Sequence, residues 1–191
     1  MRRSTGRSRP LATSSTAEAA LWETLAAEAA AESPLWGESL LPRHAQDRAA
    51  VFSRLCHPSF ALGVETIYEG YLLHYGHSRL FEPADPDTAL LLGDYLYAHG
   101  LVRVAATGST EAVHDLAELI SLCSQARADH RGGEAEAWAA TSALLGQGSL
   151  AEARADLRDR GDASALGEAA RNAAGAEAVD AACCAHDRLV G

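Results

Sequence analysis

The chain contains no lysine: all 16 of its basic residues are arginine, against 26 acidic residues, and the formal net charge is −10 at pH 7. An acidic balance of this size argues against a nucleic-acid partner, because a protein that binds phosphate backbones needs a basic face. Valine and isoleucine are scarce and do not occur in runs, so β-strands have little support. Alanine, the strongest helix former, is abundant instead, and the expected fold class is all-α.

Long apolar runs are also missing. No segment approaches the ~20 apolar residues of a membrane-spanning helix. The basic start of the chain is followed by polar and Ala-rich sequence, so no secretory signal is predicted. We therefore expect a cytoplasmic protein whose four cysteines (Cys56, Cys123, Cys183 and Cys184) are reduced thiols. The group Cys183-Cys184-Ala185-His186 lacks a second pair of ligands, and we attribute it to chance rather than to a metal site.

The pattern along the chain predicts one helical domain over residues 16–191, preceded by a disordered basic arm over residues 1–15 that is rich in Arg, Ser and Thr. Thr16 has the features of a helix N-cap, and the first helix is expected to end near Glu32. A second helix is expected over residues 38–55, although its apolar residues are only partly periodic. The Ala-rich segment 163–189 is weakly amphipathic, so we expect it to pack poorly or to cover the surface.

Two central helices have clearer boundaries. Asp85 is a good N-cap with Pro86 at the first helical position, and this helix is expected to run to about Ala106. Ser109 is expected to cap the next helix, which should run to about Ala128 with apolar residues at helical spacing. The short loop before Asp85 makes segments 58–81 and 86–106 antiparallel neighbours, at the centre of a bundle of about eight helices. Trp22 and Trp138 are expected in the core.

The segment Gly93-Asp94-Tyr95-Leu96-Tyr97-Ala98, preceded by Ala89-Leu90-Leu91-Leu92, resembles the "A-x-L-x-G-D-x-L-x-A" helix of polyprenyl diphosphate synthases. The helix, turn and helix that follow are also similar to that family, and the resemblance covers about residues 58–145. It implies a single helical bundle of the class I isoprenoid synthase type. No second aspartate-rich motif lies within residues 146–191, so the chain resembles a degenerate, truncated member that is incomplete at its C-terminus.

The upstream motifs of the family are altered. Where the family has "DDxxD", this chain has Glu65-Thr66-Ile67-Tyr68-Glu69, and where the family has "RRG" it has His74-Tyr75-Gly76. The outer carboxylates are kept one helical turn apart, so the resemblance makes Glu65 and Glu69 candidate Mg²⁺ ligands. His74 and Tyr75 would face the diphosphate without the fork of charged donors that arginine provides.

Other residues of the family's site have counterparts here. The resemblance places Phe60, Ala61, Val64 and Leu101 around the prenyl tail, with Phe60 as the floor of a short cavity. Asp94 follows Gly93 inside an apolar helix, so we expect it to be buried with a hydrogen-bond partner, in either a structural or a ligand role. A simpler interpretation of Glu65 and Glu69 also stands: they are two acids on a solvated helix face.

Three functions follow. The first is a non-catalytic protein of isoprenoid metabolism, a pseudoenzyme that binds a prenyl tail or isoprenyl diphosphate, or that pairs with an active prenyl synthase. The second is an active, divergent prenyltransferase that uses Glu65, Glu69 and Mg²⁺. The third is a helical interaction module unrelated to isoprenoids. The altered motifs favour the first, and by analogy with active members of the family we expect a homodimer or a heteromer.

Overall fold

The structure is a computed structural model that describes the backbone of residues 12–190 and the side chains of residues 18–190. This part of the chain is all-helical: it contains nine α-helices and no β-strand. The helices are α1 (Ala12–Glu32), α2 (Pro34–Glu38), α3 (Ala61–Tyr75), α4 (Pro86–Ala105), α5 (Thr110–Ala128), α6 (Glu134–Ala143), α7 (Ala151–Arg160), α8 (Ser164–Ala174) and α9 (Ala176–Val190). The all-α fold class is therefore confirmed for the described residues.

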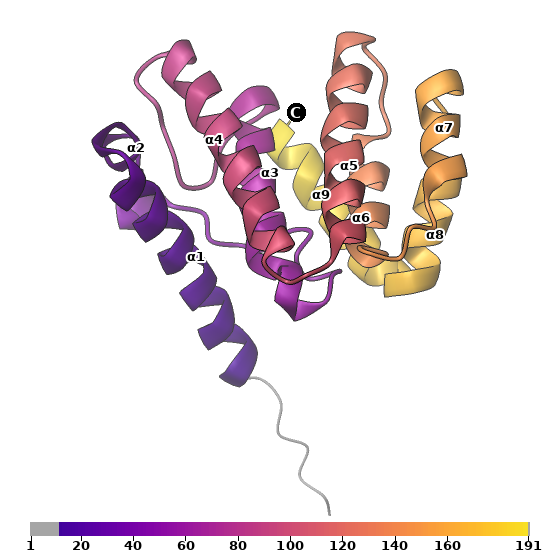
Figure 1. Cartoon of the computed structure of the whole chain (residues 1–191), viewed down its shortest axis with the longest axis horizontal. Helices are drawn as coiled ribbons and strands as arrows, with labels where there is room; N and C mark the ends of the chain where they lie inside the picture. The colour runs from indigo at the N-terminus through magenta and orange to yellow at the C-terminus, as the bar shows by residue number, and fades with distance from the viewer. Residues whose placement is uncertain (1–11, 191) are drawn as a thin grey trace, which may run out of the picture.

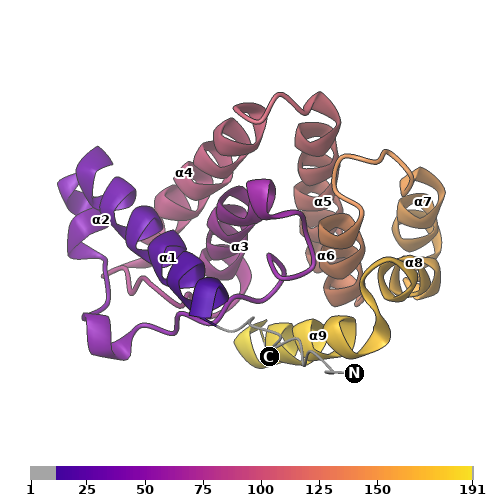
Figure 2. The ribbon, with the colours of Figure 1, turned by 90° about the horizontal axis from the view of Figure 1, so that it is seen from below.

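The helices form a layered bundle with α3 inside it. Figure 1 shows α1, α4, α5 and α7 spread along the longest axis of the molecule, with α3, α6 and α9 behind them. From below, α9 runs crosswise along one edge of the bundle and is joined to α8 by a sharp turn (Figure 2). None of the helices between residues 12 and 190 combines the length and the apolar character that crossing a bilayer requires.

The expected central position is confirmed for α3 but is wrong for α4, whose outer face exposes Leu91 and Val102. Helices α3 and α4 run antiparallel, as the sequence predicts. Their backbones approach closely at glycines: a Cβ atom on Gly100 would lie 2.9 Å from the carbonyl oxygen of Gly63. Two turns further along α3, a Cβ atom on Gly70 would lie 2.8 Å from the carbonyl oxygen of Gly93. Since real side chains do not come this close to backbone, glycine is required at these positions. The two helices therefore pack directly on each other, without space for a ligand at these crossing points.

Two groups of buried side chains form the core. The larger joins α3, α5, α6, α8 and α9 and includes Trp138, which is fully buried as predicted. The smaller lies between α1, the start of α4 and residues 80–81, and Trp22 is fully buried within it. In the larger group Phe52 stacks on Trp138, and Tyr68 meets both rings edge-on, with ring centroids 4.9–5.5 Å apart. Such contacts fix the mutual orientation of the helices that carry them.

The predicted helix over residues 38–55 is wrong. Only a short 3₁₀ turn, Arg43–Ala45, interrupts an irregular segment there. Its backbone groups are bonded to other parts of the chain: Leu41 N–H donates to the Leu80 carbonyl, and Asp47 N–H donates to the Arg79 carbonyl. These long-range bonds replace the intrahelical bonds that the sequence predicted. The weak periodicity of the segment is consistent with this outcome.

Both ends of the chain also differ from prediction. Helix α1 begins at Ala12, four residues before the predicted cap at Thr16. The predicted arm over residues 1–15 otherwise lies outside the described residues. Segment 163–189 divides into α8 and α9 at Gly175, whose φ of +87° favours glycine. Both helices bury apolar residues, among them Leu166 and Val179 at 0% exposure, so this segment belongs to the core rather than covering it loosely.

Candidate functional site

Glu65 and Glu69, the two candidate metal ligands, lie one turn apart on α3, and both are fully buried. Their side chains point at Arg79, which is fully buried as well. Arg79 Nη2 donates to Glu65 Oε2 at 2.7 Å, and Arg79 Nε donates to Glu69 Oε1 at 2.6 Å. The three side chains form a buried ion-paired cluster, the Glu65–Arg79–Glu69 triad.

The remaining oxygens of the triad are also bonded. Glu65 Oε1 accepts from the backbone N–H groups of Val51 and Ser53, at 3.0 and 3.2 Å. Glu69 Oε2 accepts from the Ser78 hydroxyl at 2.6 Å and from the backbone N–H of Arg79 at 3.2 Å. The third nitrogen of the guanidinium group, Nη1, donates to the Ala49 carbonyl at 2.8 Å. The triad thus ties α3 to the irregular segment 49–53 and to the turn at residues 78–79.

Aromatic rings enclose the Arg79 guanidinium group. Its central carbon lies 4.6 Å from the centroid of Trp22 and 5.0 Å from that of Tyr68. Burial by itself would lower the pKa of Arg79, but the two carboxylates raise it above its ordinary value. Arg79 therefore remains charged, and one fully buried cation serves two acidic side chains.

These contacts decide what the two carboxylates can hold. A Mg²⁺ ion needs carboxylate oxygens that are free to coordinate, and it keeps several waters. All four oxygens of Glu65 and Glu69 already accept hydrogen bonds, and no water-exposed side of either group remains. In this arrangement the residues do not fit a magnesium ion. No group of three or more His, Cys, Asp or Glu side chains with metal-binding geometry occurs within residues 18–190.

His74 and Tyr75, predicted to face the diphosphate, lie in the last turn of α3. The His74 ring stacks on Tyr97 with centroids 5.0 Å apart, and its Nε2 lies 3.3 Å from Asp94 Oδ1. Burial lowers the pKa of His74, while Asp94 acts in the opposite direction. The Tyr75 hydroxyl donates to Ser124 Oγ at 3.3 Å. Each residue is thus held by a neighbouring helix rather than by the triad.

Asp94 differs from expectation: its side chain is 66% exposed, not buried. Gly93 takes the inward position on this turn of α4, where a Cβ atom would lie 2.6 Å from His74 Nε2. The inward glycine turns the following residue toward solvent. The expectation of a buried Asp94 is therefore wrong.

The four residues predicted to surround the prenyl tail do not all border one cavity. Val64 is fully buried in the larger core, and Phe60 and Leu101 are half-buried against it. Ala61 lines a groove of about 610 Å³ between α1 and the start of α3. We call this the α1–α3 groove; its wall also includes Leu21, Thr24, Ala50, Ser53, Cys56, Pro58 and Leu62, with Glu18 and Arg54. The assignment of a prenyl-tail cavity stays a prediction.

Sequence reasoning missed Arg79, which is the centre of the triad. The sequence does contain a hint: Arg79 is the only Lys or Arg between Arg54 and Arg103, and Glu65 and Glu69 lie in the same stretch. Buried carboxylates on an apolar helix require a cationic partner. Arg79 is the nearest arginine to Glu69 along the chain and Arg54 the nearest to Glu65, so these two arginines were the candidates.

A comparison of the chain with protein-family models, with curated proteins and with solved structures finds no match. The fold and the site together define an all-α protein with a buried Glu–Arg–Glu triad. The similarity to polyprenyl diphosphate synthases stays a prediction based on the motifs in the sequence.

Proposed function

We propose that this chain is a non-catalytic relative of the polyprenyl diphosphate synthases, which binds a prenyl amphiphile or a partner enzyme without ionising a diphosphate. The observation that carries the proposal is the Glu65–Arg79–Glu69 triad. At the position where the family resemblance puts the first metal-binding motif, both carboxylates are ion-paired with one arginine of the same chain.

The energetics of the triad support this proposal. Ionising an allylic diphosphate builds negative charge on the leaving group, and stabilising that charge is usually the largest catalytic contribution. Freeing Glu65 and Glu69 for a metal would leave Arg79 buried and unpaired, which typically costs ~3–5 kcal/mol. The triad also anchors segment 49–53, so its opening would disturb the surrounding fold.

The α1–α3 groove is the place we propose for a prenyl chain. Its wall is mostly apolar and includes Ala61, which the family resemblance assigns to the tail. Arg54 lies at the groove and donates to Glu18 Oε1 at 3.0 Å. Since Arg54 is largely exposed, an anionic head group can compete with Glu18 for its guanidinium group.

Binding of farnesyl diphosphate to the purified protein tests the proposal, with calorimetry as the readout. We expect binding without a requirement for Mg²⁺. Ala61→Trp should weaken it by filling the groove, whereas Ala98→Trp, on the exposed face of α4, should leave it unchanged. Equal affinities for the two variants, or no binding by the wild-type chain, would contradict a prenyl site in this groove.

A helical interaction module is the second candidate, and one observation favours it. Three of the four exposed large hydrophobic side chains in the described chain lie on α4: Leu90, Leu91 and Val102, at 52%, 56% and 65% exposure. Leu91 and Val102 are three turns apart on one helix face. If a partner protein unrelated to isoprenoids covers this face, Leu91→Glu should abolish the complex while leaving the fold intact.

A further inference from the structure

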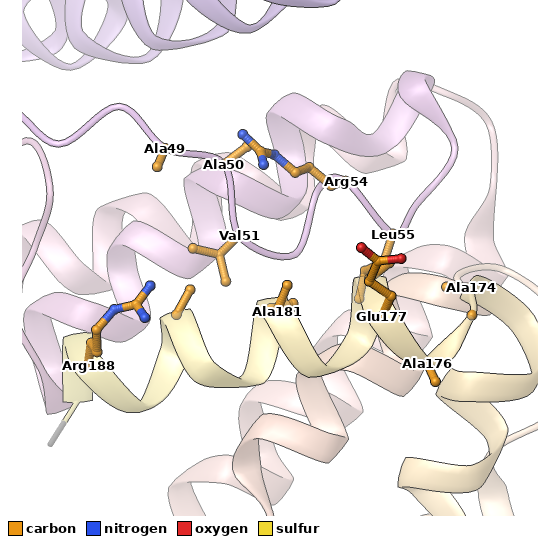
Figure 3. A pocket seen from close by; sticks show the side chains of 14 residues that line it. Ala49, Ala50, Val51, Arg54, Leu55, Ala174, Ala176, Glu177, Ala181 and Arg188 are labelled. Atoms are coloured by element: carbon orange, nitrogen blue, oxygen red, sulfur yellow. The ribbon is translucent and has the colours of Figure 1, made fainter.

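A second groove, of about 760 Å³, runs along α9 beside the irregular segment 49–55. We call it the α9 groove. Val51 and Leu55 line it from one side, and α9 contributes Ala178, Ala181 and Ala185 from the other (Figure 3). The small side chains of α9 leave its backbone accessible, so another helix can approach closely along this side.

Helix α9 is a rigid wall for this groove. Its opposite face buries Val179 and His186, and Ala182 is buried at the edge of the groove. Tyr68 OH lies 3.0 Å from His186 Nδ1, and the N–H of His77 donates to the carbonyl of Leu189 at 2.8 Å. The accessible face of α9 is thus fixed in position by contacts along its length.

Two opposite charges mark the ends of the groove. Glu177 lies near the start of α9 and Arg188 near its end, and in Figure 3 both side chains rise on the same side of the helix, with Ala181 between them. They are separated by three helical turns, or ~16 Å along the axis. Neither forms an ion pair with any residue in the described part of the chain, whereas Arg54 in the opposite wall is paired with Glu18.

This pattern is complementary to itself. Glu177 and Arg188 are equally distant from a point between Ala182 and Cys183, close to the middle of α9. If two α9 helices pack antiparallel about a two-fold axis through that point, Glu177 of each helix faces Arg188 of the other, and Ala181 and Cys184 meet at the centre. A two-fold interface uses the same patch on both molecules and therefore requires such self-complementarity.

We propose that the α9 groove is the interface of a homodimer, in which the α9 helix of a second copy of this chain occupies the groove. The charges select the antiparallel direction, because a parallel pair would place Glu177 against Glu177 and Arg188 against Arg188. The proposal is independent of the proposed function, since it uses neither the triad nor the α1–α3 groove.

Charge reversal tests the proposal, with the molecular mass measured by sedimentation over the micromolar range. We expect a dimer for the wild-type chain. Arg188→Glu and Glu177→Arg should each weaken it by about tenfold or more, because each replaces two attractions with two repulsions. The double variant Glu177→Arg/Arg188→Glu should recover the dimer. Both residues are exposed, so circular dichroism should show an unchanged fold.

Two further variants test whether the dimer interface lies on the α9 groove. Leu91→Glu, on α4, should leave the dimer intact, and Ala181→Cys in a Cys184→Ala background should give a disulfide-linked dimer on mild oxidation. A monomer at all concentrations would overturn the proposal. So would a dimer that is insensitive to both charge reversals, or one that is lost in Leu91→Glu and retained in Arg188→Glu.

Discussion

The Glu65–Arg79–Glu69 triad predicts a large loss of stability when Arg79 is replaced by methionine. Methionine keeps most of the length of the side chain but removes its charge and all three side-chain hydrogen bonds. Two fully buried carboxylates would then lack a cation. Removing one partner of a buried ion pair typically costs ~3–5 kcal/mol. Since a domain of this size has ~5–15 kcal/mol of stability in total, the loss should be obvious in urea denaturation.

The pH dependence supplies a second readout of the same variant. Without Arg79, the folded variant holds two buried carboxylates with no cation beside them, and burial disfavours the charged form of a carboxyl group. Neutral carboxyl groups, which are more abundant at low pH, are tolerated better in such a position. The difference in unfolding free energy between wild type and Arg79→Met should therefore shrink as the pH falls from 7 toward 5.

A matched control is Arg43→Met, which removes an exposed arginine that pairs with Glu23. Exposed ion pairs contribute ~0–1 kcal/mol to stability, so the unfolding free energy of this variant should be close to that of wild type. The stability of Arg79→Lys should lie between those of Arg79→Met and Arg43→Met. Lysine keeps the positive charge but lacks the planar guanidinium group that donates to both carboxylates. A loss below about 1 kcal/mol for Arg79→Met would refute the stabilising role of the triad.

Two further predictions concern the core. Burial lowers the pKa of His186 to about 4. Between about pH 6.5 and 4, the unfolded chain therefore binds a proton at this residue more readily than the folded chain does. The free energy of unfolding should fall by ~3 kcal/mol as the pH decreases through that window. In urea denaturation, His186→Asn should remove this part of the pH dependence of the unfolding free energy. The same pH dependence in wild type and variant would contradict a buried, neutral His186. Gly100→Ala places a Cβ atom 2.4 Å from Ile67 Cγ1 and should destabilise the α3–α4 pair by ~1–3 kcal/mol, although alanine is the better helix former. The melting temperature of Gly100→Ala checks this prediction, with Ala98→Leu, on the exposed face of α4, as the control. A melting temperature of Gly100→Ala above that of wild type would show that the two helices are not in direct contact.

Helix boundaries with a local chemical cause could be predicted from the sequence. The Asp85 side chain accepts a hydrogen bond from the N–H of Thr88 at 2.8 Å, and Ser109 Oγ accepts from the N–H of Ala112 at 3.1 Å, so both predicted caps are confirmed. Each cap depends only on residues three positions apart. Local sequence is sufficient for such contacts.

Features with a non-local cause could not be predicted in this way. Segment 38–55 contains enough apolar residues for a helix, but its backbone is bonded to Glu65, Arg79 and Leu80 instead. The burial of Glu65 and Glu69 depends on the same contacts. A motif fixes the spacing of two carboxylates along a helix, but the partner they meet is decided by the packing of a distant turn.

The most direct test of the proposed function is incorporation of labelled isopentenyl diphosphate into an allylic diphosphate by the purified chain in the presence of Mg²⁺. We predict no product above background, because Glu65 and Glu69 are held by Arg79. An active prenyl synthase assayed in parallel is the positive control. Mg²⁺-dependent product from this chain alone, lost in Glu65→Gln while the variant stays folded, would contradict a non-catalytic role and favour an active, divergent prenyltransferase.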